Sequence, residues 1–102
     1  MGCEEDYVDE RHVRWAEEVL ISPSVGWKVL GKRAKFSIDG FNATSYLCNY
    51  ARDSQVIRLH EFREATDDIG EHCEGRGGWI HDRVKNVRYG FIKKGKKFCE
   101  DL

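Results

Sequence analysis

Cysteine and histidine are the residues of this chain whose chemistry could define a site, and there are four of each. An even number of cysteines in a short chain predicts a disulfide framework, with three pairings open among Cys3, Cys48, Cys73 and Cys99. A zinc site is the alternative, because zinc takes sulfur and imidazole ligands in fours. The spacing disfavours zinc, since there is no Cys-x-x-Cys pair and the neighbours His72 and Cys73 would point about 100° apart on a helix. We therefore expect all four cysteines in disulfides, and neither a metal nor another cofactor.

Acid–base catalysis is a second chemistry that the histidines could support. His60 precedes Glu61 and lies four residues before Glu64, and His81 precedes Asp82. Imidazole titrates near neutral pH, so either pair could act as general acid and base, as a small ribonuclease requires. The carboxylates around His60 fall on a predicted helix whose other face is apolar, which is typical of a solvated surface. We expect no catalytic residues and keep a ribonuclease-like enzyme as the alternative.

A basic C-terminal region is the strongest charge feature of the sequence. Residues 76–99 contain eight basic residues and one acidic residue, interleaved with aromatic side chains, and this pattern is typical of single-stranded nucleic acid binding. Strand alternation instead predicts Tyr89 and Phe91 in the core and Arg88 toward water, so a merely solvated face is the simpler interpretation. A functional face of this kind would bind an acidic protein, an anionic polysaccharide or membrane surface, or RNA. The predicted binding residues are Arg83, Lys85, Arg88, Lys93, Lys94, Lys96 and Lys97.

Composition and length bound the architecture. With 102 residues, 40% of them hydrophobic and a net charge of −1, the chain suits one globular domain over residues 1–102. No apolar run reaches the roughly 18 residues of a membrane span, so we expect none. The first twenty residues carry seven acids against two bases, which gives the two ends of the chain opposite charge.

Periodicity predicts an α+β fold: an antiparallel sheet with one or two helices packed on one face, stabilised by disulfides. Apolar residues at helical spacing predict a first helix over about 4–21, with acids in its first turns and a stop at Ser22-Pro23-Ser24. Residues 27–59 are rich in strand formers, beginning with two short strands around a turn at Gly31-Lys32-Arg33. A second helix is predicted over about 60–74 and strands over 79–99, with turns at Asn86 and Gly95.

From residue 44 onward, a series of landmarks follows in a fixed order: Tyr46-Leu47-Cys48-Asn49-Tyr50, a helix with Phe62 and Ala65 that closes at Cys73, Gly77-Gly78-Trp79, Tyr89-Gly90-Phe91 and Phe98-Cys99. This order resembles a group of small secreted fungal proteins, many of them effector-like. The resemblance implies secretion, disulfide bonds and a role in virulence or competition, at the interface with a host or another microbe. It implies no reaction, and the Tyr-x-Cys element also resembles ribonuclease-like fungal effectors, which often lack catalytic residues.

The sequence therefore predicts a secreted, non-catalytic binding protein that recognises a host or competitor protein or an anionic surface. The chain begins Met1-Gly2 without an apolar secretory segment, which we interpret as a mature form whose signal peptide has been removed. An Asn42-Ala43-Thr44 glycosylation pattern agrees with a secretory route. An RNA-binding protein that uses the basic C-terminal region remains the alternative.

Overall fold

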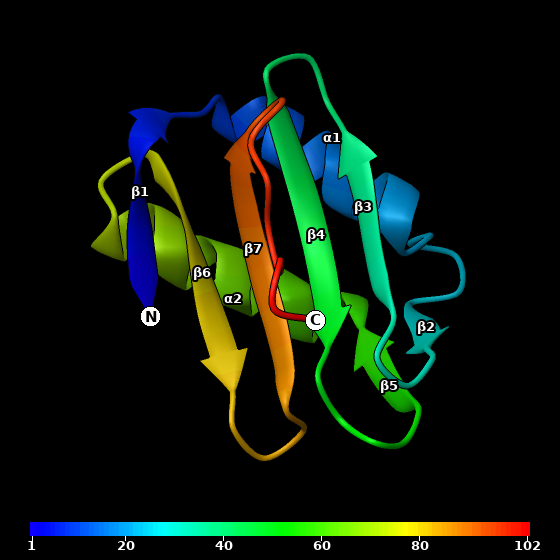
Figure 1. Cartoon of the computed structure of the whole chain (residues 1–102). Coiled ribbons are helices and arrows are strands. Elements are labelled where there is room, and N and C mark those ends of the chain that lie inside the picture. The colour runs from blue at the N-terminus through cyan, green and yellow to red at the C-terminus, as the bar shows by residue number, and fades with distance from the viewer.

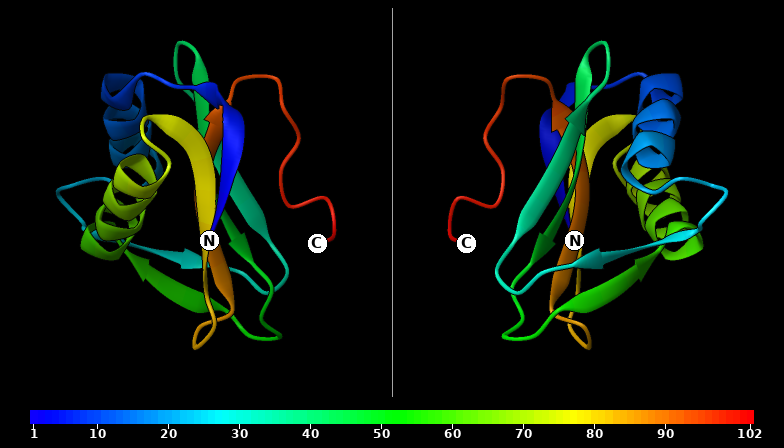
Figure 2. Two further views of the ribbon diagram at one scale, coloured as in Figure 1. Left: turned by 90° about the vertical axis from the view of Figure 1, so that its left-hand side faces the viewer. Right: turned by 90° about the vertical axis from the view of Figure 1, so that its right-hand side faces the viewer.

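Five antiparallel strands form the central sheet of the computed structural model, which describes residues 1–102. Their order across the sheet is β1-β6-β7-β4-β3, and β2 and β5 pair in a small sheet of their own. Both helices pack on one face of the large sheet, and the C-terminal segment crosses its other face (Figure 1, Figure 2). The predicted α+β class is therefore confirmed. The elements are β1 (Gly2–Tyr7), α1 (Glu10–Leu20), β2 (Trp27–Leu30), β3 (Lys35–Asp39), β4 (Ala43–Asn49), β5 (Gln55–Arg58), α2 (Leu59–His72), β6 (Arg76–Asp82) and β7 (Val87–Lys93).

The first strand, β1, occupies residues that the sequence pattern assigns to the first helix. The predicted helix over 4–21 is wrong at its start, because α1 begins only at Glu10. Asp9 caps it, its carboxylate accepting the backbone N–H of Arg11 at 2.9 Å. Exposure alternates along β1, and the strand pairs with β6 at the sheet edge. This long-range pairing outweighs the local preference of its acidic residues for a helix N-terminus.

The first helix, α1, packs on the sheet along one side only. It ends at Leu20, just before the stop predicted at Ser22-Pro23-Ser24. Trp15 and Val19 lie on its outer side and remain about half exposed, although they are among the apolar residues that predicted the helix. The buried side is Val13, Ala16, Glu17 and Leu20, so one of its four buried residues is a carboxylate.

The small sheet joins two strands from the middle of the chain that are not consecutive. Residues 27–30 and most of 34–38 form strands around a turn, as expected, but they do not pair with each other. β2 pairs with β5, and β3 pairs with β4 in the large sheet. Asn49 links the two sheets, because its buried amide donates to the carbonyl of Leu30 at 3.1 Å. β2 and β5 lie so far apart in the chain that their pairing carries no local sequence signal.

The second helix follows β5 directly and closes the main core. It spans Leu59–His72, close to the predicted 60–74, and its buried residues recur at intervals of three and four. Phe62 is fully buried beside Tyr89, with ring centroids 6.1 Å apart. Glu74 and Gly75 then turn the chain into β6 with positive φ angles of 54° and 86°. Neither α1 nor α2 has the length and apolar character that crossing a membrane requires.

A second, smaller core lies on the opposite face of the sheet, beneath the C-terminal strap, residues 94–102. Residues 97–99 are not in a strand, which corrects the prediction of strands over 79–99; that part of the chain crosses β7 and β4 as an irregular segment (Figure 1). Phe98 of the strap stacks on Tyr46, with ring centroids 4.5 Å apart. The Tyr46 ring lies over Gly90, where any Cβ would meet it at 2.4 Å.

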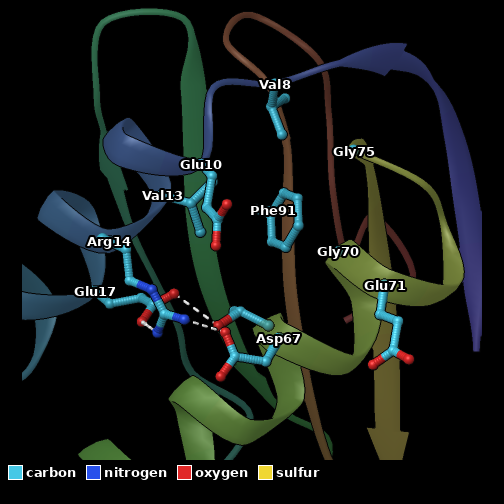
Figure 3. A pocket seen from close by; sticks show the side chains of 11 residues that line it. Val8, Glu10, Val13, Arg14, Glu17, Asp67, Gly70, Glu71, Gly75 and Phe91 are labelled. Atoms are coloured by element: carbon cyan, nitrogen blue, oxygen red, sulfur yellow. Dashed lines mark hydrogen bonds and ion pairs between the residues drawn. The ribbon is translucent and has the colours of Figure 1, made fainter.

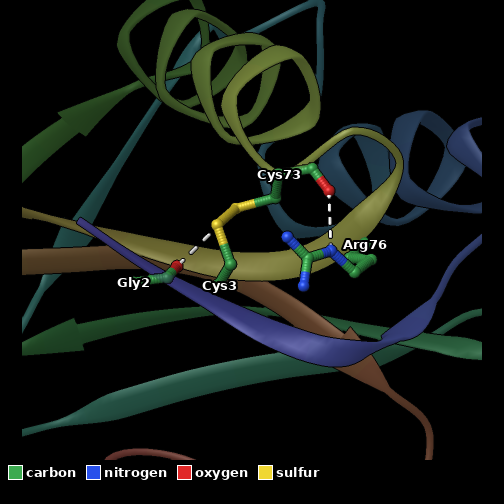
Figure 4. Close-up of a disulfide and its surroundings, with 4 residues drawn as sticks. All are labelled: Gly2, Cys3, Cys73 and Arg76. Carbon is green, nitrogen blue, oxygen red and sulfur yellow. Dashed lines mark hydrogen bonds between the residues drawn. A yellow bond between two sulfur atoms is a disulfide. The ribbon is translucent and has the colours of Figure 1, made fainter.

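Two disulfides fix the outer parts of the fold, and the structure confirms that all four cysteines are paired. Cys3–Cys73 joins the edge strand β1 to the end of α2, where Arg76 Nε donates to the Cys73 carbonyl at 3.1 Å (Figure 4). Cys48–Cys99 joins the middle of the sheet to the strap. One bond therefore secures the first strand and the other secures the last segment.

Candidate functional site

The C-terminal end of β7 presents an exposed turn with four lysines, here called the lysine turn: Lys93, Lys94, Lys96 and Lys97. All four side chains are exposed, and one of them has a carboxylate within 4.0 Å: Lys96 Nζ lies 3.9 Å from Asp6. The other three ammonium groups are free to meet a partner. Four of the seven predicted binding residues thus lie on one short segment.

The backbone of the lysine turn is held from both ends. Lys93 pairs with Ala43 in the sheet, and the N–H of Lys94 donates to the Asn42 carbonyl at 3.0 Å. Gly95 adopts φ +94° at the tip, in agreement with the predicted turn. After the turn, Cys99 is bonded to the sheet. The lysines therefore extend from a fixed base, which reduces the conformational entropy that binding would cost.

The remaining predicted binding residues lie elsewhere. Arg83 and Lys85 belong to the β6–β7 turn at the other end of β7, about 20 Å from the lysine turn along the strand. Lys85 is already paired with Glu61 at 2.8 Å. The structure therefore does not bring the seven basic residues together on one surface, because Arg83 and Lys85 precede β7 and the lysine turn follows it.

Arg88 is engaged in the smaller core. Its guanidinium lies over the Trp79 ring at 4.3 Å and over the Tyr50 ring at 5.1 Å. The Tyr50 hydroxyl donates to Asp101 at 2.7 Å, which fastens the end of the strap. Burial and this hydrogen bond raise the pKa of Tyr50 to about 12, and the same bond holds the pKa of Asp101 below its usual value. The side chain of Arg88 thus stabilises the strap side of the sheet.

The two histidines considered for catalysis lie on opposite faces of the sheet. His60 is in the first turn of α2. His81 follows Ile80 in β6, so the two side chains point to opposite faces of the sheet. Ile80 packs into the helix-side core, and the Nε2 of His81 lies 2.8 Å from Asn86 Oδ1 on the strap side. The carboxylate beside it, Asp82, accepts the backbone N–H groups of the β6–β7 turn at 2.9 and 3.2 Å. The carboxylates of Glu61 and Asp82 already have structural partners. Glu61 forms an ion pair with Lys85, and Asp82 accepts the backbone N–H groups of the β6–β7 turn.

A cleft between α1 and α2 is the feature that sequence reasoning missed. It has a volume of about 400 Å³ and combines apolar walls with four carboxylates (Figure 3). Glu17 is fully buried there, with Oε1 accepting the Thr66 hydroxyl at 2.6 Å. Desolvation raises the pKa of Glu17 to about 6, although Thr66 and the nearby guanidinium groups of Arg14 and Arg63 act in the opposite direction.

One sequence signal could have identified this cleft. Glu17 falls at the spacing of the buried residues Val13, Ala16 and Leu20, so the apolar stripe of α1 is interrupted by a carboxylate. A charged residue in such a position needs a partner or a function. The sequence does not show where α2 lies, so it does not show which groups face Glu17.

Comparisons with protein-family models, with curated proteins and with solved structures found no match to this chain. The likeness to secreted fungal proteins rests on the residue pattern alone and stays a prediction.

Proposed function

We propose that this chain is a secreted, non-catalytic, effector-like binding protein that uses the lysine turn to contact an acidic patch on a host or competitor protein. The observation that carries the proposal is the turn itself: four exposed lysines within five residues, on a backbone held by the sheet and by Cys48–Cys99. Preorganised charge of this kind favours fast and specific association with a surface of opposite sign.

The charges next to the turn favour a protein partner over a long polyanion. Asp6 of β1 lies beside Lys96, and Glu4 lines a shallow pocket together with Lys97. An RNA or polysaccharide strand that ran past the turn would meet these carboxylates at close range. A protein partner can present a small acidic patch with neutral or basic groups around it, which complements this arrangement.

The disulfides support action outside the cell. Thiols in the cytosol are kept reduced, and paired cysteines in small proteins are typical of secreted ones. Both bonds in this chain close long segments, with sequence separations of 70 and 51 residues. We propose secretion on this basis, together with the pattern shared with secreted fungal proteins.

A charge-reversal experiment tests the contact surface. The variant Lys93→Glu/Lys94→Glu/Lys97→Glu leaves the Lys96–Asp6 pair in place, and the control Lys32→Glu/Arg52→Glu/Arg83→Glu makes the same change in net charge at exposed, unpaired residues elsewhere. A fluorescent acidic peptide is titrated with each protein at low salt. We expect the turn variant to lose about tenfold or more in affinity, the control to retain most of it, and both to keep the wild-type melting temperature within a few degrees.

Two results would refute the proposed contact. Equal losses in both variants would mean that the peptide responds to net charge and not to the turn. Unchanged binding by the turn variant would place the contact elsewhere. Tighter binding of a single-stranded RNA of the same length, lost in the turn variant, would favour the RNA-binding alternative.

A further inference from the structure

The turn that joins β3 to β4 carries the sequence pattern of an N-glycosylation site, Asn42-Ala43-Thr44. The N–H of Gly40 donates to the Ala43 carbonyl at 2.7 Å and closes the turn, so Phe41 and Asn42 form its tip. The turn lies at the end of the sheet where β4 begins and β7 ends (Figure 1). A bulky group attached at such a tip extends into solvent and leaves the strand pairing intact.

The carboxamide of Asn42 has one atom engaged and the other free. Its Oδ1 lies 3.0 Å from His12 Nδ1, which fixes the side chain against the first turn of α1. Its Nδ2 has no hydrogen-bond partner and is not buried. N-glycosylation attaches the sugar to this nitrogen and leaves the oxygen that pairs with His12 unchanged. The fold therefore accommodates the modification without losing a hydrogen bond.

Phe41, the residue before Asn42, is an aromatic ring that the core does not cover. It is 82% exposed, and its ring centroid lies 5.2 Å from that of His12. His12 thus contacts both residues of the tip, which places the Phe41 ring and the Asn42 carboxamide around one imidazole. An exposed ring gains free energy when an apolar surface covers it, and the C–H face of a sugar is such a surface.

Thr44, whose hydroxyl the glycosyl transferase recognises in this pattern, is enclosed in the folded chain. It is buried and pairs with Asp39 of β3 on one side and Ile92 of β7 on the other. Its hydroxyl donates to the Asp39 carboxylate. The enzyme therefore has access to the hydroxyl only before the β3–β4 hairpin closes, so the sugar must be attached to the nascent chain.

We propose that Asn42 carries an N-linked glycan in the secreted protein, with the first sugar packed against Phe41. The donor is an oligosaccharide carried on a polyprenyl pyrophosphate. Nδ2 forms a bond to the anomeric carbon, the bond from that carbon to the phosphate oxygen breaks, the lipid pyrophosphate leaves, and the amide nitrogen releases one proton. The inference rests on the secretion proposed above, because this transfer takes place in the secretory pathway.

The attached glycan lies beside the lysine turn. The N–H of Lys94 donates to the Asn42 carbonyl at 3.0 Å, and Lys93 pairs with Ala43. The glycan leaves the charges of the turn in place and occupies the space on one side of them. Glycosylation therefore acts on which partners can approach the turn and not on its charge.

Secretion from yeast behind a host signal peptide tests the site. We expect the secreted wild-type protein to exceed the mass of the bare chain by a whole glycan, and a peptide-N-glycosidase to remove the excess. Asn42→Gln should have no glycan. Thr44→Ser and Thr44→Val form a matched pair, because only the first keeps the hydroxyl, so the Ser variant should be modified at least in part and the Val variant not at all.

The outcomes separate this site from the proposed function. The host signal supplies entry to the secretory pathway, so a secreted wild-type protein without a glycan, or a glycan that persists in Asn42→Gln, overturns the glycan and leaves the lysine turn untouched. The acidic-peptide titration is repeated on Asn42→Gln, which has no glycan, and its result does not depend on this site.

A cycle of four proteins tests the contact with Phe41. Wild type and Phe41→Ala, each trimmed by an endoglycosidase to a single sugar, are compared with Asn42→Gln and Phe41→Ala/Asn42→Gln. We expect the sugar to raise the melting temperature by about 2–4 °C when Phe41 is present and by about 1 °C or less when it is absent. Equal changes in both backgrounds overturn the packing of the sugar on Phe41.

Discussion

Glu17 is the residue at which folding and ionisation are most directly coupled. Burial raises its pKa from 4.5 to about 6, so between these values the folded chain holds a proton that the unfolded chain has released. The free energy of unfolding therefore contains a contribution that is fully present below about pH 4.5 and is lost as the pH rises through about 6. Each pKa unit is worth about 1.4 kcal/mol, which makes this contribution on the order of 2 kcal/mol.

Replacing Glu17 with Gln should remove this pH dependence. We expect the wild-type protein to lose about 2 kcal/mol of stability relative to Glu17→Gln between about pH 4.5 and pH 7.5. Urea denaturation of both proteins at the two pH values measures the difference. Glu64→Gln, at an exposed position of the same helix that contacts Glu17, serves as the control and should titrate like wild type. Parallel stability profiles for all three proteins would contradict the assignment.

At the scale of elements, each disulfide holds one segment at the margin of the fold. β1 is an edge strand paired only with β6, and Cys3–Cys73 connects it to the end of α2. The strap has no strand partner, and Cys48–Cys99 connects it to β4 beside the stacked Tyr46 and Phe98 rings. The two bonds should therefore act locally, each on its own segment.

Removing the bonds one at a time tests this local action. In Cys3→Ala/Cys73→Ala we expect faster amide exchange in β1 and unchanged exchange in the strap, and in Cys48→Ala/Cys99→Ala the reverse. Each loss should lower the free energy of unfolding by about 2–5 kcal/mol. Hydrogen exchange followed by mass spectrometry measures both segments in one experiment, so each variant is the control for the other. Faster exchange throughout the sheet in either variant would show that its bond stabilises the whole fold and not one segment.

What the sequence predicted at this scale depended on local patterns. α2 was predicted almost to the residue because its apolar residues recur at intervals of three and four, and the turns at Asn86 and Gly95 form where expected, with positive φ angles. β1 was missed because its acids resemble a helix start, and only its pairing with β6 makes it a strand. The pairing of β2 with β5 joins residues nearly thirty apart, for which periodicity gives no information.

The same distinction applies to the candidate site. The turn at Gly95 was predicted from a local pattern, and four of the seven predicted binding residues flank it within five residues. The separation of Arg83 and Lys85 from them follows from the direction of β7. Arg88 was expected to face water and instead lies against Trp79 and Tyr50, since the strap covers that side of the sheet. The cleft at Glu17 requires knowledge of how two helices sit side by side, and no local pattern contains it.

At the scale of the whole molecule, the acidic cleft and the lysine turn are separate features of opposite charge. The carboxylate-lined cleft lies between the helices, and the lysine turn leads into the strap on the other side (Figure 2). A net charge of −1 hides this separation. The lysine turn is therefore a local basic surface on a chain of nearly neutral net charge, which is the physical basis of the proposed function.

The disulfides make this arrangement stable in so small a chain. A domain of about 100 residues buries only about two thirds of its unfolded surface, so its hydrophobic margin is narrow. Here one core lies between sheet and helices and a second lies under the strap, and each is closed by one bond. The stability of the fold therefore depends on both pairs, and the fixed base of the lysine turn depends on Cys48–Cys99.

Disulfide mapping of the native protein tests this dependence most directly. Intact mass is measured before and after reduction, with thiol alkylation, and the linked peptides are then identified. We predict no alkylation of the native protein, a mass lower by four hydrogens than that of the reduced chain, and linked peptides joining Cys3 to Cys73 and Cys48 to Cys99. Four alkylated cysteines, or a Cys3–Cys48 or Cys3–Cys99 link, would contradict the account.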